Sequence, residues 1–160
     1  MHYYSSLPSL LAVAASLLTS QAAAKPEQIR AVQDPIFHYY LQAYPQDPSI
    51  PVMGPESSSE YFNIDGTIQS TNTSRYLSIN GDEPTSYKTL TFANGSGANV
   101  WALEGDTIIT GKSSSWGRQL NFLVCKLDGN FWQVYLQTGS ATPSGKTCSN
   151  YQSLHLPCLC

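Results

Sequence analysis

Residues 120–136 read Leu-Asn-Phe-Leu-Val-Cys-Lys-Leu-Asp-Gly-Asn-Phe-Trp-Gln-Val-Tyr-Leu, and this stretch decides the fold class. Two runs rich in aromatic and β-branched residues, which favour strands, flank the dipeptide Asp128-Gly129. Asp-Gly tolerates the positive φ values of a tight turn between antiparallel strands. The stretch therefore predicts a β-hairpin.

The same signal recurs along the preceding sequence, at Asp65-Gly66, Asn80-Gly81, Asn94-Gly95 and Glu104-Gly105-Asp106. No segment after the N-terminal region keeps apolar residues at helical spacing for three turns. We therefore expect an all-β domain of about ten short strands in sequential hairpins. A compact barrel-like or β-trefoil-like single domain is favoured, and a β-sandwich is the alternative.

The N-terminal region has the pattern of a secretion signal. A mostly apolar run over residues 7–18 is followed by small residues at 22–24, which suit signal peptidase. We predict a signal peptide over residues 1–24, a flexible leader over the polar, proline-containing residues 25–35, and a single domain over 36–160. The first strand is expected over the aromatic residues 36–41.

Composition excludes several classes of protein. The 160 residues hold 8 Lys+Arg and 11 Asp+Glu, which give a net charge of -3, and 11% of them are aromatic. A disordered chain has few aromatic residues, and a nucleic-acid partner needs a basic patch that this chain lacks. No later apolar stretch is long enough for a membrane anchor. We expect a secreted protein, extracellular or in the cell wall.

The four cysteines are Cys125, Cys148, Cys158 and Cys160. An even number of cysteines in an exported chain indicates disulfides, and four cysteines allow three pairings. The spacing favours Cys125–Cys148, which leaves the last two joined to each other or free to link to another chain. A metal site at the Cys-x-Cys end is the weaker interpretation, so we expect no metal and no cofactor.

Three further positions are candidates for modification or binding. Asn72-Thr73-Ser74 and Asn94-Gly95-Ser96 are glycosylation sequons in turn-like contexts, so Asn72 and Asn94 are predicted glycosylation sites. Trp101 and Trp132 lie within predicted strands and are expected in the core. Trp116 lies in a predicted loop and is the candidate ring for stacking on a ligand such as a sugar.

One set of residues is typical of a nuclease. His38, Glu56 or Glu60, Arg75 and His155 occur in the order used by small secreted fungal ribonucleases. Such an enzyme needs a base, an acid and a positive charge near the phosphate. Any chain with two histidines can supply this order, and no surrounding motif supports it. We therefore expect a protein that is not an enzyme, with no catalytic residues.

Several segments together resemble the cell wall protein PhiA family of filamentous fungi. The resemblance lies in residues 37–43, residues 47–51, the segments 76–79 and 100–103, and the closing hairpin of residues 121–125 and 131–136 with the following Cys148. It covers about residues 36–156 of the chain. Two departures are the missing early cysteine pair of some relatives and the Cys158-Leu159-Cys160 end.

This resemblance implies a non-catalytic, secreted glycoprotein of the fungal cell wall, acting in conidium or phialide development or in stress protection. Its expected partners are wall polysaccharide or wall proteins. One alternative is a secreted effector or allergen-like binding protein. The other is a small extracellular hydrolase such as a ribonuclease.

Overall fold

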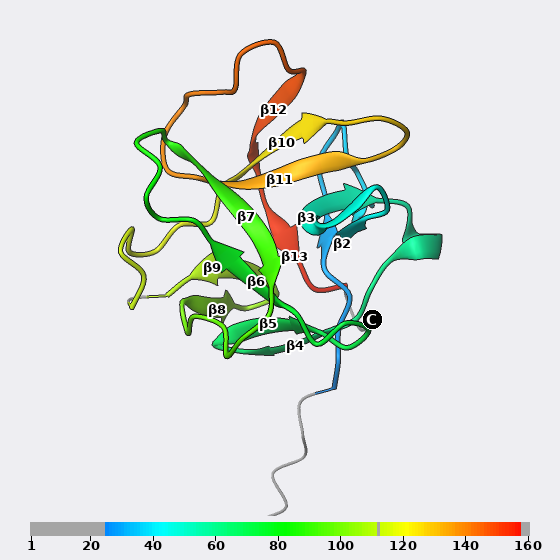
Figure 1. The fold of residues 1–160 in the computed structure, drawn as a ribbon, viewed down its shortest axis with the longest axis vertical. Coiled ribbons are helices and arrows are strands. Elements are labelled where there is room, and N and C mark those ends of the chain that lie inside the picture. Colours follow the sequence, from blue (N-terminus) through cyan, green and yellow to red (C-terminus); the bar gives the residue numbers. More distant parts are fainter. Residues whose placement is uncertain (1–24, 112, 158–160) are drawn as a thin grey trace, which may run out of the picture.

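A computed structural model describes residues 25–111 and 113–157, and these residues form an all-β fold (Figure 1). Thirteen strands and one short 3-10 helix, η1 (Glu56–Ser58), make up its regular structure. The strands join in a nearly closed, barrel-like antiparallel sheet. The expected fold class is confirmed. No helix in these two ranges is long and apolar enough to cross a membrane.

The strands in chain order are β1 (Arg30–Ala31), β2 (Tyr40–Tyr44), β3 (Asp47–Gly54), β4 (Phe62–Asp65), β5 (Thr67–Ser70), β6 (Tyr76–Ile79), β7 (Tyr87–Ala93), β8 (Trp101–Glu104), β9 (Thr107–Thr110), β10 (Phe122–Lys126), β11 (Trp132–Gln137), β12 (Cys148–Gln152) and β13 (Leu154–His155). Along the sheet, neighbouring strands follow the order β4-β5-β6-β7-β11-β3-β2-β1-β13-β9-β8. Off this path, β10 pairs with β11 and β12.

Most of the predicted hairpins form where the turn residues indicate them. Asn94-Gly95 is the exception, because β7 pairs with β6 and β11 and the following strand β8 pairs with β9. In the β10–β11 hairpin, Val124 lies opposite Val134, and Gly129 in the turn has a φ of 72°. The pairs β4–β5 and β8–β9 also close around their predicted turns. Positive φ at glycine carries no steric penalty, so these turns form locally from a few residues.

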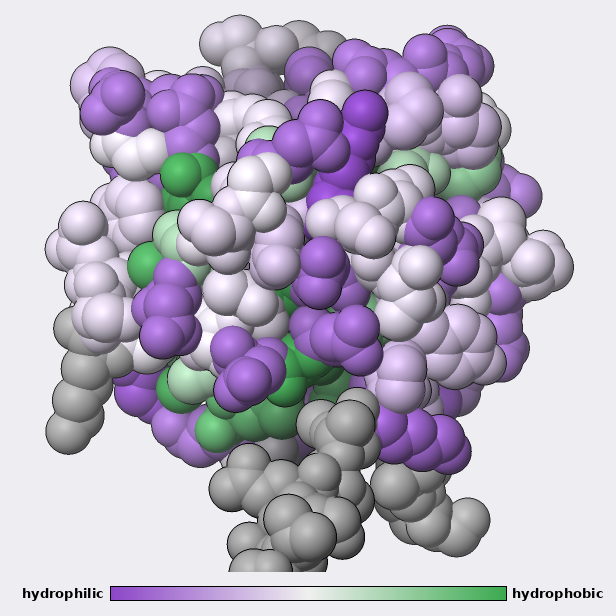
Figure 2. Space-filling view, turned by 60° about the horizontal axis from the view of Figure 1, so that its bottom comes forward, coloured by the Kyte–Doolittle hydropathy of each residue, from purple (hydrophilic) through white to green (hydrophobic). Residues whose placement is uncertain are grey.

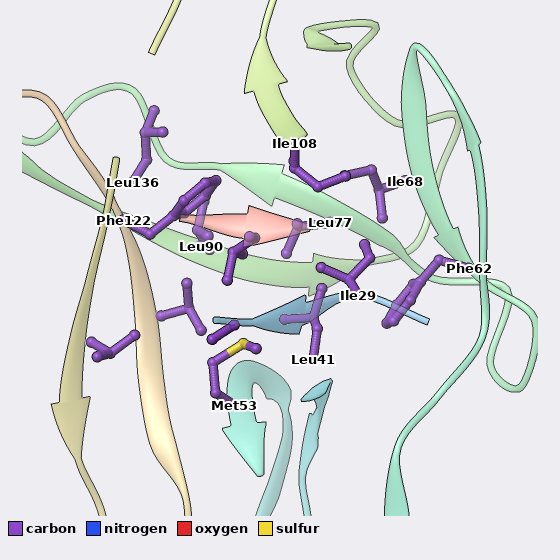
Figure 3. Packing of buried hydrophobic residues seen from close by; sticks show 14 of the residues in the cluster. Ile29, Leu41, Met53, Phe62, Ile68, Leu77, Leu90, Ile108, Phe122 and Leu136 are labelled. Atoms are coloured by element: carbon purple, nitrogen blue, oxygen red, sulfur yellow. The ribbon is translucent and has the colours of Figure 1, made fainter. Parts of the chain in front are cut away.

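Alternation along the strands fills the interior of the barrel. In β7 buried and half-buried residues alternate at every position, as expected when one face of a strand packs on a core. Figure 3 shows side chains from different strands pointing into one common interior. The members of this cluster with the largest fully buried side chains include Ile29, Leu41, Phe62, Ile68 and Phe122. Each such side chain contributes about 1.5–3 kcal/mol by leaving water.

Both strand tryptophans pack on this core. Trp101 is buried, and its indole N–H donates to the backbone oxygen of Leu77 at 2.9 Å, so its one polar group is satisfied. Trp132 is half-buried and packs against the same cluster. The prediction of core tryptophans is confirmed for Trp101 and holds in part for Trp132.

The N-terminal segment corrects one prediction. Residues 25–35 do not form a flexible leader but belong to the barrel: Ile29 and Ala31 are fully buried, and β1 pairs with both β2 and β13. Glu27 adds an isolated bridge to Phe62. The sequence signal for this strand is only Ile29-Arg30-Ala31, in which two apolar residues flank one polar residue. Three residues between Pro26 and Pro35 are too few to identify a strand by alternation.

The first long strand also begins later than predicted. Residues 36–39 form a turn, and β2 starts at Tyr40. The backbone N–H of Ile36 donates to Gln33 and that of Tyr39 donates to Ile36, while His38 has a φ of 60°. These bonds bend the chain so that β2 runs back along β1. The aromatic character of residues 36–41 indicated a strand, but local turn bonds occupy the first four of them.

Gly66 lies where the two ends of the sheet approach each other. The backbone N–H of Trp101, in the edge strand β8, donates to the carbonyl oxygen of Gly66, next to the other edge strand β4, at 2.9 Å. Gly66 has a φ of 67°, and a Cβ added there would lie 1.8 Å from Oδ1 of Asn99. Any other residue would strain the backbone and would force the exposed Asn99 side chain to move.

We expect Gly66→Ala to lower the free energy of unfolding by about 2 kcal/mol, because it displaces the Asn99 side chain at the junction in addition to straining left-handed backbone. Urea unfolding followed by tryptophan fluorescence measures the loss. Gly105→Ala is the matched control, since Gly105 has a φ of 62° but nothing within 4 Å of an added Cβ. The control should lose only about 1 kcal/mol. Equal losses in the two variants would contradict close packing at this junction.

Candidate functional site

A disulfide joins β10 to β12 on one side of the sheet. Cys125 and Cys148 lie directly opposite each other, with their Cα atoms 4.0 Å apart, and form the bond predicted from their spacing. Cys125 is fully buried and, with Leu123 and Tyr135, forms a second small apolar cluster beside the main core. The bond therefore fastens β12 to the barrel. Cys158 and Cys160 lie outside the described residues.

Both sequon asparagines are exposed. Asn72 lies in the turn between β5 and β6, and Asn94 directly follows β7. Tyr76, the first residue of β6, pairs with Ala93, the last residue of β7. The two sequons therefore lie at the same end of adjacent strands. This places both asparagines on loops that a glycosylating enzyme could reach.

Trp116 lies in a loop, as predicted, but it is half-buried rather than exposed. Its ring packs against the main core and lies 3.4 Å from the position of a Cβ on Gly81. Its backbone N–H donates to the hydroxyl of buried Ser114, and its carbonyl oxygen accepts from the amide of Gln119. The ring joins two loops, so packing accounts for most of its surface. Only the remaining part is available to a ligand.

The ribonuclease-like residues make their polar and stacking contacts with other partners. The His38 ring stacks on Phe37, with 3.8 Å between ring centroids. The buried carboxylate of Glu60 accepts hydrogen bonds from the backbone of Ala43 and from Ser70. Within residues 25–111 and 113–157, no hydrogen bond or ion pair joins any two of His38, Glu56, Glu60, Arg75 and His155. Direct polar contacts therefore give no support to a nuclease site.

His155 instead belongs to a polar cluster on the outer face of β13. Its Nε2 atom lies 2.8 Å from the hydroxyl of Ser153, and its Nδ1 atom lies 3.3 Å from Oδ1 of Asp106 and 3.2 Å from the hydroxyl of Thr107. The contact with Asp106 arises because His155 pairs with Thr107 across β13 and β9. The hydrogen bond with His155 holds the pKa of the Asp106 carboxyl below its usual value.

Two tautomers of the neutral His155 ring fit these contacts. With the proton on Nδ1, the ring donates to the Asp106 carboxylate and Nε2 accepts from the Ser153 hydroxyl. With the proton on Nε2, Nδ1 accepts from the Thr107 hydroxyl and Nε2 donates to Ser153. The first arrangement is a directed chain from serine through histidine to carboxylate.

Sequence reasoning missed this cluster. It placed Asp106 in a turn, considered His155 only within the ribonuclease-like set that it rejected, and did not consider Ser153. One signal was available: Ser153 and His155 are two residues apart around the buried Leu154, so they share the outward face of a strand. The proximity of Asp106 depends on strand register, which the local sequence does not contain.

No group of three or more His, Cys, Asp or Glu side chains in residues 25–111 and 113–157 could hold a metal ion. The other exposed ion pair in these ranges joins Arg118 to Glu104. It raises the pKa of the Arg118 guanidinium through its hydrogen bonds with Glu104. Because both side chains are about half exposed, solvent screens the pair and it contributes little to the stability of the fold.

Removal of the disulfide should weaken the fold without unfolding it. We expect the double variant Cys125→Ala, Cys148→Ala to lose about 2–4 kcal/mol, because the bond no longer restricts the unfolded chain over a separation of 23 residues. Urea unfolding of the oxidised protein and the variant measures this difference. A midpoint that is the same for both would mean that β12 is held without the bond.

No family model matches the chain, and no curated protein or solved structure matches it either.

Proposed function

We propose that the chain is a secreted glycoprotein of the fungal cell wall, acting in conidium or phialide development or in stress protection. The observation that carries this proposal is the placement of the two sequons. Asn72 and Asn94 are both exposed, both lie in loops, and both lie at the same end of adjacent strands. Glycans attached there would cover one end of the β5–β7 region and leave the rest of the barrel accessible.

The disulfide also supports a location outside the cytosol. Cys125–Cys148 is a bond between neighbouring strands, and such bonds persist in oxidising environments outside the cytosol. A small barrel fastened in this way resists the local opening that proteases need. Both properties suit a protein that stays outside the cell.

The surface supports polysaccharide as a partner. Figure 2 shows hydrophilic residues over most of the end of the barrel that carries β4 and β5, with apolar residues gathered in a smaller area. Only 12% of the sequence is charged, so the polarity comes mainly from hydroxyl and amide groups. Such groups form hydrogen bonds with sugar hydroxyls, and the proposed wall role needs no further chemistry.

Glycosylation can be tested at each sequon. We expect Asn72→Gln and Asn94→Gln each to remove one glycan from the protein secreted by a fungal host, because each change destroys one acceptor amide. Intact-mass spectrometry before and after enzymatic removal of N-linked glycans measures the losses. Asn130→Gln is the control, since Asn130 is an exposed turn asparagine outside any sequon. A wild-type protein without glycans would remove the main support for the proposal.

The proposed wall role can be tested by finding where the protein accumulates in a culture. The producing culture is separated into medium, detergent-soluble wall and wall released by reductant, and the protein is quantified in each fraction. We expect it in the reductant-released wall, held through Cys158 and Cys160, with Cys158→Ser, Cys160→Ser shifted to the medium. Recovery of the wild-type protein entirely in the medium would overturn the wall role and favour a secreted effector.

A further inference from the structure

The hydrogen-bonded chain Ser153–His155–Asp106 has the order of partners that activates a serine nucleophile. Such a serine needs a base within hydrogen-bond reach, and the base needs a third group that orients it. Ser153 is 2.8 Å from Nε2 of His155, and Asp106 is 3.3 Å from Nδ1. We propose that these three residues form a hydrolytic site that acts on acyl esters, with Ser153 as the nucleophile.

The fold holds each of these three residues in place. Ser153 directly precedes β13 and His155 lies in it, while Leu154 between them is fixed in the core. Asp106 lies in the tight turn between β8 and β9, and its carbonyl oxygen accepts the backbone N–H of Leu156 at 2.8 Å. The base and its orienting carboxylate are thus joined through backbone bonds as well as through their side chains.

The His155 side chain is accessible from outside. It is 19% exposed and Ser153 is half-buried, so a small ester can approach the hydroxyl while the imidazole stays held. This accessibility suits an ester carried on a larger molecule or a small free ester. Because the site lies on the surface, it does not require the substrate to enter an interior cavity.

Arg30 supplies a positive charge beside this site. It lies directly opposite His155 across β1 and β13, so the two side chains share a face and their Cβ atoms are about 5 Å apart. Its Nε atom is buried and has no hydrogen-bond partner among the described residues. On this face, next to His155, a guanidinium that reached the ester would stabilise the negative oxygen that develops when the ester is attacked.

The reaction proceeds in two balanced steps. The Ser153 oxygen forms a bond to the ester carbonyl carbon while its proton passes to Nε2 of His155. The bond from that carbon to the alkoxy oxygen then breaks, and the leaving alcohol takes the proton. Water attacks the acyl-serine in the same way, with His155 again accepting and returning a proton, and the carboxylic acid leaves. Asp106 stays ionised throughout and keeps the ring oriented.

This proposal goes beyond the wall role and departs from the expectation that the chain is not an enzyme. The competing explanation is that the three side chains only satisfy one another on the surface. The two explanations differ in the reactivity of Ser153, because a serine that merely donates a hydrogen bond is a weak nucleophile.

The test uses the full secreted protein and a fluorophosphonate probe, in which serine displaces fluoride from phosphorus. Peptide mapping by mass spectrometry measures labelling at each serine. Ser49 is the internal control, since it is also half-buried and donates to a carboxylate, Asp47, at 2.7 Å, but has no imidazole partner. We expect Ser153 to be labelled at least about 100-fold faster than Ser49.

Variants of the three partner residues separate the base, the orienting carboxylate and the positive charge. His155→Ala should abolish labelling of Ser153, Asp106→Asn should slow it at least about tenfold, and Arg30→Gln should slow turnover of a p-nitrophenyl ester. Circular dichroism checks that each variant folds. Equal labelling of Ser153 and Ser49 in the wild-type chain would overturn the proposal without any variant. Ester turnover that persists in Ser153→Ala would also overturn it.

Discussion

The barrel depends on the pairing of a two-residue strand. β1 is the link between β2 and β13 in the sheet, so Arg30 and Ala31 connect the strands from β4 to β2 with the group formed by β13, β9 and β8. The backbone of Ala31 also holds the turn that leads into β2, since its carbonyl oxygen accepts the N–H of His38 and its N–H donates to Tyr39. Without this strand the sheet would have two separate parts and the core would open between them.

Sequence predicts the local part of this fold well and the non-local part poorly. The hairpin over residues 120–136 follows from its turn dipeptide and flanking strands, because all the interactions that define it lie within a short stretch. β1 has no such signal. Ile29 and Ala31 are buried by strands far away in the chain, one of them formed by residues 154–155. A strand this short is specified by its partners, and the propensity of its own residues cannot identify it.

The same distinction explains the results for the candidate sites. The Cys125–Cys148 pair could be predicted because Cys125 lies in the recognisable hairpin and Cys148 follows that hairpin at a spacing that lets the chain return beside it. The ribonuclease-like set has no direct polar contact among its members in the described residues, and order along a chain does not by itself place residues together in a barrel. The outward pair Ser153 and His155 follows from the alternation of one strand, but Asp106 joins it only through the register of β9 against β13. A shift of that register by one residue would turn Thr107 to the other face.

The β8–β9 hairpin takes part both in closing the barrel and in forming the polar cluster. β8 donates the Trp101 N–H that bonds the two ends of the sheet, and the turn after β8 presents Asp106 to His155. β9 then pairs with β13, which in turn pairs with β1. The position of Asp106 is thus determined from both sides of the hairpin, by the junction at Gly66 and by the short strand at the centre of the sheet. This coupling explains how a small domain without helical layers can hold three polar side chains in a fixed order on its outer face.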